Sequence, residues 1–159
     1  MSQSTPTVRR IRGARFRIGV VAARFNETLV DGLLGQLTAG LRKAGVPAGR
    51  IQLIRVPGSH EVPWAAGRLA ASRRHDCVVA LGVLIGGDTS HHEMVGQSVS
   101  HALQRVALDT GIPVINGVIV ADTVAQARAR CTGRINRGAE FAQAALAMAE
   151  LKTALKGKS

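Results

Sequence analysis

A glycine-rich turn followed by two histidines is the chemically most informative segment of the sequence. Residues 86–92 read GGDTSHH and directly follow an apolar run at 76–85. Two glycines let the backbone approach a ligand closely, free amides at a helix start favour an anion, and Thr89 and Ser90 add hydroxyl donors. Asp88 would repel a phosphate unless it faces away. The segment predicts a phosphate site, with a plain turn capped by one of these three polar residues as the competing interpretation.

His91 and His92 fall in the first turn of the helix expected after this segment. An imidazole at that place can accept or donate a proton for a reacting group. Adjacent histidines point in different directions on a helix, and His92 with Glu93 lacks the partner four residues away that a zinc helix uses. We therefore expect no metal ion, and an exposed polar histidine is the alternative for each of the two.

Three further segments place functional side chains near turns. Phe25 offers a flat face for stacking a heterocycle, or else packs as a staple on the next helix. The turn at 56–61 presents backbone amides and the Glu61 carboxylate, which either binds a polar ligand or carries favourable charge at a helix start. In the last segment, one of four arginines could clamp a phosphate, or all could form a solvated basic face. These four are Arg128, Arg130, Arg134 and Arg137.

Alternating apolar patterns define the elements that must position these segments. β-Branched or apolar runs predict strands, and apolar residues at helical spacing between turn signals predict helices. The strands are expected at 17–22, 50–56, 76–85 and 113–120, and the helices at about 29–44, 61–73, 91–111, 123–130 and 138–155. Thr28 is expected to cap the first of these helices, and Asp122 the fourth.

This order of elements favours right-handed crossovers and one parallel sheet. We expect an α/β three-layer sandwich with a four-stranded parallel sheet of the flavodoxin-like kind and helices on both faces. The run at 76–85 is the most apolar and is expected to be central. Ligands bind at the carboxyl ends of the strands in such sheets, which is where all the segments above fall except the arginine cluster.

Charge is concentrated at the two ends of the chain, whose net charge is +11. Five arginines lie between residues 9 and 17, and three lysines follow residue 151. Setting these aside leaves 13 basic against 10 acidic residues, so the body is only mildly basic. Phe16 is the only aromatic residue among the N-terminal arginines, and nucleic acid is not an expected partner. Residues 1–15 are expected to form a flexible basic arm or an edge strand, and residues 16–157 a single domain.

Aromatic residues make up only 3% of the chain, so the core must be built from Val, Ile, Leu and Ala. The two cysteines, Cys77 and Cys131, are too few for a disulfide framework, and Cys77 lies in an apolar run that predicts a core position. A reducing cytosol fits this usage. No apolar stretch follows the N-terminal arginines and no run is long enough to span a bilayer. We therefore expect a cytoplasmic protein with no membrane partner.

Five motifs, by their sequences, order and spacing, resemble those of the 6,7-dimethyl-8-ribityllumazine synthase family. The resemblance covers nearly the whole chain after residue 15. They are ARFN at 23–26, VPGSHEVP at 56–63, GVLIGGDTSHHEMV at 82–95, PVINGVIVADT at 113–123 and NRGAEFAQAAL at 136–146. The resemblance implies that 5-amino-6-(D-ribitylamino)uracil condenses with 3,4-dihydroxy-2-butanone 4-phosphate, with loss of phosphate and water. It implies no metal or redox cofactor, and these two small molecules as the substrates.

The resemblance also implies roles for individual residues. Phe25 stacks on the pyrimidine, His91 transfers the proton, and Asn116 and Arg130 reach the site from a neighbouring subunit. Arg130 grips phosphate, with Arg128 or Arg134 left open as alternatives because the turn after Arg130 is shorter than usual. The other substrate-binding residues that the resemblance implies are Asn26, Ser59, His60, Glu61, Val83, Leu84, Ile85, Gly87, Asp88 and Thr89.

Family members form pentamers, and many build a hollow shell of sixty subunits. The short turn at 132–136 resembles that of shell formers, so self-association into pentamers, and from them a shell, is expected. This chain departs from the family pattern where His60, His92 and Asn116 replace aromatic residues and Gly86 replaces arginine. These departures and the basic arm support a second hypothesis. It is a non-catalytic shell or binder that holds flavin-like heterocycles or polyanionic cargo.

Overall fold

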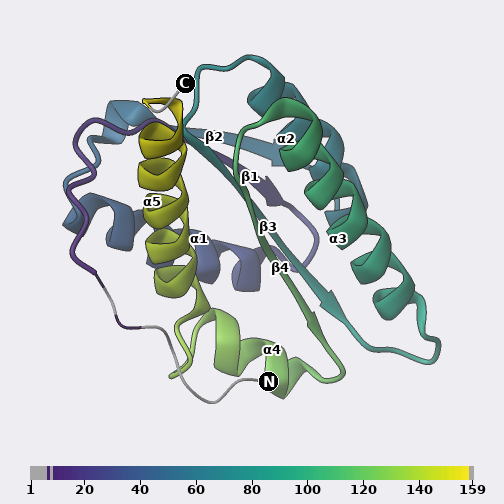
Figure 1. Cartoon of the computed structure of the whole chain (residues 1–159). Helices are drawn as coiled ribbons and strands as arrows, with labels where there is room; N and C mark the ends of the chain where they lie inside the picture. The colour runs from purple at the N-terminus through teal and green to yellow at the C-terminus, as the bar shows by residue number, and fades with distance from the viewer. Residues whose placement is uncertain (1–6, 8, 158–159) are drawn as a thin grey trace.

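Four strands and five α-helices make up the computed structural model, which describes residue 7 and residues 9–157 (Figure 1). The strands are β1 (Ile18–Ala23), β2 (Ile51–Val56), β3 (Cys77–Ile85) and β4 (Val114–Ala121). The α-helices are α1 (Glu27–Lys43), α2 (Val62–Ala71), α3 (His91–Thr110), α4 (Val124–Cys131) and α5 (Arg137–Lys156). Two short 3-10 helices are η1 (Ala48–Arg50) and η2 (Ser59–Glu61). Every expected strand and helix is present, with ends shifted by a few residues.

The four strands form one sheet in the order β2-β1-β3-β4, and all three pairings are parallel. Ile18 of β1 pairs with Ile51 of β2 on one side and with Cys77 of β3 on the other. β3 lies between β1 and β4, and its first seven residues are all buried, as expected for the most apolar strand. The prediction of an α/β flavodoxin-like sandwich with a four-stranded parallel sheet is confirmed.

Helices cover both faces of this sheet (Figure 1). One core lies between the sheet and α1, α4 and α5, with Leu33 and Leu146 among its buried side chains. The other core lies between the sheet and α2 and α3, and includes Leu69 and Leu103. Alternate residues of β3 enter the two cores, because successive side chains of a strand point to opposite faces. Both cores consist almost entirely of aliphatic side chains, as the low aromatic content requires.

Two predicted helix caps are wrong by one or two positions. α1 begins directly after Asn26, which is its N-cap in the left-handed conformation with φ at 56°, so Thr28 already lies inside the helix. α4 is capped by Thr123, whose hydroxyl accepts a hydrogen bond from the Gln126 amide at 3.2 Å. Asp122 therefore precedes the cap. As a result, neither the Asn26 side chain nor the Asp122 side chain caps a helix, and both lie at the carboxyl end of the sheet.

The described part of the N-terminal basic segment packs against the domain. Ile11 is buried in the core that α5 covers, and Arg9 forms an ion pair with Glu150 of α5 at 3.6 Å. From Arg9 up to β1 the chain forms neither helix nor strand. Residues 1–6 and 8 of the expected arm lie outside the described residues. None of the helices in the described ranges is long and apolar enough to cross a bilayer.

Both cysteines are buried free thiols. Burial raises the pKa of the Cys77 thiol to about 12 and that of the Cys131 thiol to about 11. Both thiols therefore stay protonated near neutral pH, where a nucleophilic cysteine needs its thiolate. The predicted core position of Cys77 is confirmed, and neither cysteine is a candidate for catalysis.

Candidate active site

A pocket of about 770 Å³ lies at the carboxyl ends of β1 and β3. It brings together segments that are up to 70 positions apart in the chain, from the β1–α1 turn to the first turns of α3. The predicted site residues that line it are Phe25, Asn26, Ser59, His60, Glu61, Val83, Leu84, Ile85, Gly87, Thr89 and His91. Asp88 is exposed in the same turn without lining the pocket, and Asn116 and Arg130 lie elsewhere.

The β1–α1 turn is tied to the end of β3 by Asn26. Its side-chain amide donates a hydrogen bond to the Val83 carbonyl at 2.8 Å, and its backbone is in the left-handed conformation. The backbone N–H of Phe25 donates to the Pro57 carbonyl at 3.0 Å, so the turn is also joined to the loop after β2. The Phe25 ring itself is 73% exposed. It packs on no core, so the staple interpretation is wrong and the ring is available to a ligand.

The turn between β2 and α2 supplies one buried hydroxyl and one carboxylate. Glu61 Oε2 accepts a hydrogen bond from the Gly58 amide at 2.8 Å, so this carboxylate shapes the turn as well as lining the pocket. Ser59 is 4% exposed, and its hydroxyl has no hydrogen-bond partner. Gly82 makes room for it, because a Cβ at that position would lie 2.4 Å from the Ser59 hydroxyl. A buried hydroxyl without a partner is costly, and its place in the pocket wall makes Ser59 a candidate binding residue.

The turn after β3 is open to the pocket. Nothing lies within 4 Å of the place that a Cβ at Gly87 would occupy, so a ligand can approach this backbone. Ser90 is the N-cap of α3 and makes no side-chain capping hydrogen bond. The amides of Glu93 and Met94 donate to the Ser90 carbonyl at 3.1 and 3.2 Å, so the amides of His91 and His92 are the ones left for an anion. The capping alternative for this turn loses its support at Ser90, and phosphate binding here stays a prediction.

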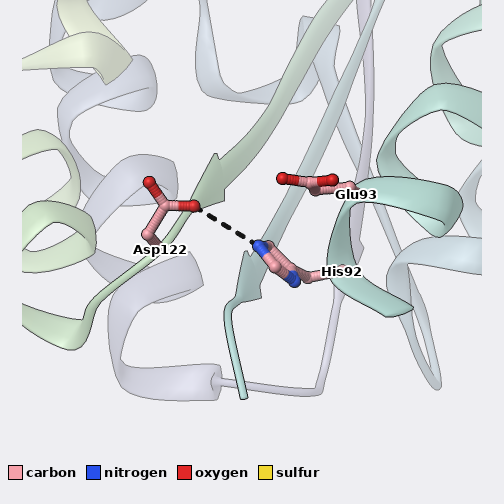
Figure 2. Close-up of side chains that lie close together, drawn as sticks. All are labelled: His92, Glu93 and Asp122. Carbon is pink, nitrogen blue, oxygen red and sulfur yellow. Dashed lines mark hydrogen bonds and ion pairs between the residues drawn. The ribbon is translucent and has the colours of Figure 1, made fainter. Parts of the chain in front are cut away.

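The two histidines at the start of α3 differ in their surroundings. His91 is exposed and lines the pocket, which leaves its ring nitrogens accessible to a substrate. His92 lines it as well, but its side chain is only 11% exposed, and its Nε2 lies 3.5 Å from Asp122 Oδ1 (Figure 2). The donor atoms of His92, Glu93 and Asp122 all lie within 4.8 Å of one another, a donor set that could hold a divalent cation. This cluster was not expected from the sequence, because Asp122 is remote along the chain from His92 and Glu93.

Asn116 and Arg130 do not reach this pocket within the chain. Asn116 lies on β4, where its Oδ1 accepts a hydrogen bond from the Val118 amide at 3.1 Å, and it lines a second cavity of about 520 Å³ beside Phe141. Arg130 lies on α4 and donates from its guanidinium to the Gln126 carbonyl at 2.9 Å. The structure therefore brings neither residue to His91, and their predicted arrival from a neighbouring subunit stays a prediction.

Comparisons with known proteins show the family to which the chain belongs. The family model for 6,7-dimethyl-8-ribityllumazine synthase matches residues 15–153. The chain belongs to this family. A curated protein of that name from Nitrosospira multiformis is 40% identical over 145 residues, which are 91% of this chain and 89% of the relative. Another from Halorhodospira halophila is 43% identical over 141 residues, 88% of this chain and 90% of the relative. A third from Thermococcus gammatolerans is 41% identical over 139 residues, which are 87% of this chain and 89% of the relative.

Membership of the lumazine synthase family confirms the resemblance read from the five motifs, all of which lie inside the matched residues. The pocket of this family member has one marked electrostatic feature. Three histidines and one glutamate line it, and no lysine or arginine does so among the residues that the structure describes. A phosphorylated ligand would therefore meet backbone amides, hydroxyls and imidazoles from this chain, and a guanidinium or ammonium group would have to come from outside the pocket.

Proposed function

We propose that the chain condenses 5-amino-6-(D-ribitylamino)uracil with 3,4-dihydroxy-2-butanone 4-phosphate to form 6,7-dimethyl-8-ribityllumazine, a step of riboflavin biosynthesis. The observation that supports this most directly is the family membership over residues 15–153. The pocket agrees with it, because a stacking ring, a buried hydroxyl and an open turn lie around the exposed side chain of His91. The enzyme is a transferase by this reaction.

The chemistry needs an anion site, a proton carrier and a surface for a heterocycle. The amine of the uracil attacks the ketone and an imine forms with loss of water. Elimination of phosphate then leaves an enol that tautomerises to a carbonyl on the neighbouring carbon. The ribitylamino nitrogen attacks that carbonyl and closes the ring, with loss of a second water. His91 is the residue to move protons between these groups, because its ring is exposed at the pocket and lies next to the open turn at Gly87. No step of this scheme requires an electron carrier.

The substrate-binding roles divide between the two sides of the pocket. Phe25 stacks on the pyrimidine from the β1–α1 turn, and the unpartnered Ser59 hydroxyl binds a polar group of the ribityl-bearing substrate. Gly87 and Thr89 bind the phosphate group, with Asp88 exposed beside them. The remaining residues proposed to contact the substrates are Asn26, His60, Glu61, Val83, Leu84 and Ile85.

Self-association belongs to the same proposal. A pentamer in which a neighbour supplies Asn116 and Arg130 would add the missing cation to the pocket. Apolar surface near the open edge of β4 supports association, because Leu108, Leu151 and Leu155 are 73%, 45% and 61% exposed. A sixty-subunit shell is the larger assembly proposed, on the short turn at 132–136. A cytosolic location is proposed as well, supported by the two free buried cysteines.

The test is a direct assay with the purified full chain and the two substrates. We expect the fluorescent lumazine to form at a rate above the uncatalysed reaction, and inorganic phosphate to appear in equal amount. Omission of either substrate is the control. Binding of the heterocycle without any product, under varied pH and substrate concentration, would replace this proposal with the non-catalytic binder.

The contribution of a neighbour is tested by assembly and by arginine variants. Sedimentation of the native chain should give a mass of five subunits or a multiple of five, and a monomer with full activity would contradict the shared site. Arg128→Ala, Arg130→Ala and Arg134→Ala are compared for the KM of the phosphorylated substrate. The phosphate ligand is the arginine whose loss raises this KM most, by about tenfold or more, as expected for a charge-assisted pair.

A further inference from the structure

The predicted phosphate turn, residues 86–90 between β3 and α3, is in direct backbone contact with the turn between β4 and α4. Gly86, which follows β3, donates its N–H to the carbonyl of Ala121 at the end of β4, at 2.8 Å. A Cβ at Gly86 would lie 2.6 Å from the carbonyl oxygen of Asp122, so only glycine allows the two backbones to come this close. The β3–α3 turn and the β4–α4 turn therefore share one junction.

His92 crosses the same junction with its side chain. Its Nε2 lies 3.5 Å from Asp122 Oδ1, and the ring extends from the first turn of α3 toward the loop after β4 (Figure 2). The ring is 89% removed from solvent, and its Nδ1 is buried without a partner, so the bond to Asp122 is the polar contact that compensates this burial. The backbone N–H of Asp122 is itself held by the Gln126 side chain at 2.9 Å. The acceptor is therefore anchored to α4.

We propose that His92 and Asp122 are positioning residues, which hold the phosphate turn and His91 in the geometry that the reaction needs. This inference rests on the function proposed above. His91 and His92 are consecutive in the first turn of α3, so the rotation of that turn sets the direction of both side chains. Residues 87–90 of the phosphate turn are all exposed, and nothing lies within 4 Å of a Cβ at Gly87. The junction beside it is what fixes its position.

A purely electrostatic role of Asp122 predicts the opposite change in phosphate binding when its side chain is removed. The carboxylates of Asp122 and Glu93 lie close together at this end of the sheet, and each repels a phosphate anion. Removing one of them as a bystander would strengthen phosphate binding. Removing it as a positioning residue would weaken binding, because the turn would lose its fixed geometry. The sign of the change therefore separates the two roles.

The experiment uses inorganic phosphate as the probe, by titration calorimetry on the full chain, together with kcat and KM. Asp122→Ala and His92→Leu each remove the contact, and we expect phosphate binding about tenfold weaker, with kcat reduced as well. Asp122→Asn keeps an acceptor for Nε2–H and removes the charge, so it should stay within about threefold of the unaltered chain. Glu93→Gln is the matched control, since it removes a neighbouring charge without touching the contact.

Non-additivity is the second readout. The double variant Asp122→Ala/His92→Leu should be no weaker than the more damaged single variant, because both changes break one interaction. Independent, additive losses would overturn the proposal, as would an Asp122→Ala chain that binds phosphate as tightly as the unaltered one. If His92→Leu fails to fold, Asp122→Ala decides alone, because the Asp122 side chain is 75% exposed.

The two proposals fail separately in this design. An unaltered chain that binds phosphate with the expected variant pattern, yet makes no lumazine, removes the enzymatic function and leaves the positioning role. A chain that makes lumazine while all variants bind phosphate equally removes only the positioning role. A chain that binds no phosphate at all overturns the positioning role whatever its activity.

Discussion

Polar side chains at the two ends of the sheet differ in whether they have hydrogen-bond partners within the chain. At the amino ends of the strands, Asp76 accepts hydrogen bonds from the backbone N–H of Arg17 at 2.8 Å and from Lys152 at 3.3 Å. His75 is buried beside them, with its Nε2 2.9 Å from the Gln52 side-chain oxygen. This end is a closed network, in which charges and hydrogen-bonding groups satisfy one another.

The carboxyl ends leave such groups unsatisfied. Three buried side-chain atoms have no hydrogen-bond partner within the described residues, and all three lie toward this end. They are Nη1 of Arg55, the hydroxyl of Ser59 and Nδ1 of His92. Phe25 adds an exposed aromatic ring at the same end. Native proteins pair nearly all of their buried polar groups, so this concentration indicates an end that is completed by a ligand or by another subunit.

This difference in pairing suggests that the amino end of the sheet serves folding stability and the carboxyl end serves ligand binding. Polar contacts at the amino end contribute to folding, because their partners are in the same chain. The unpaired groups at the carboxyl end contribute little to folding until a ligand arrives. Substitutions at the amino end should therefore cost stability and leave turnover unchanged, and substitutions at the carboxyl end should do the reverse. The predictions that follow test this division.

The largest effect is expected for His91→Ala at the carboxyl end. Loss of the proton carrier should lower kcat by about a hundredfold or more, with no loss of stability because the side chain is exposed. Lumazine formation and thermal unfolding are measured on the same preparation. His101→Ala is the matched control, an exposed histidine of the same helix outside the pocket. Equal activity of the two variants would exclude His91 as the proton carrier.

The next effect is expected for Asp76→Ala at the amino end. Removal of the acceptor for Arg17 and Lys152 should lower the free energy of unfolding by about 2 kcal/mol, and kcat should not change. Urea unfolding measures the loss. Asp109→Ala is the control, because its exposed ion pair with Arg105 should contribute less than about 1 kcal/mol. A large loss of kcat in Asp76→Ala, with stability intact, would break the division between the ends.

A smaller effect is expected for Phe25→Ala. The KM for the ribitylaminouracil substrate should rise by up to about tenfold, since a stacked aromatic pair contributes about 1 kcal/mol beyond the area that it buries. Stability should be unchanged, because the ring is 73% exposed. Trp64→Ala is the comparison, a ring that is 74% exposed and does not line the pocket. The stacking role is wrong if both variants keep the original KM.

The smallest effect is a pH dependence of stability from His75. Burial lowers the pKa of His75 below its ordinary value of 6.5, so the unfolded chain binds a proton that the folded chain resists. Its contribution to stability is complete above about pH 6.5 and is lost as the pH falls below that value. Urea unfolding between pH 7 and 5 should show this slope, and His75→Gln should flatten it. An unchanged slope in the variant would assign the effect to other groups.

Much of the fold followed from local patterns in the sequence. β-Branched runs and helical spacing predicted every strand and helix, because burial on one or two faces imposes these periods on the residues themselves. The boundaries were less certain. Asn26 rather than Thr28 caps α1, since the hydrogen bond from Asn26 to Val83 crosses 57 positions of sequence and no local pattern reports it.

The candidate site was predictable to a similar degree. Parallel strands end at the same edge, so the residues that follow β1, β2 and β3 had to meet, and the pocket lined by Phe25, Ser59 and His91 is that meeting place. The contact of His92 with Asp122 was not predictable. Either residue alone is an ordinary polar side chain, and only the crossover through β4 puts them 3.5 Å apart.

Patterns in the amino-acid sequence were enough to establish the element order, the parallel sheet, the family and the residue types at the pocket. These depend on periodicity and on motifs, which are properties of neighbouring residues. The tertiary structure alone decided which polar groups are paired and which are left free. It closed the network around Asp76, left the Ser59 hydroxyl unsatisfied, and brought Gly86 against Asp122. Hydrogen bonding and close backbone approach depend on distances between remote segments, and packing of the sheet and its helices sets those distances.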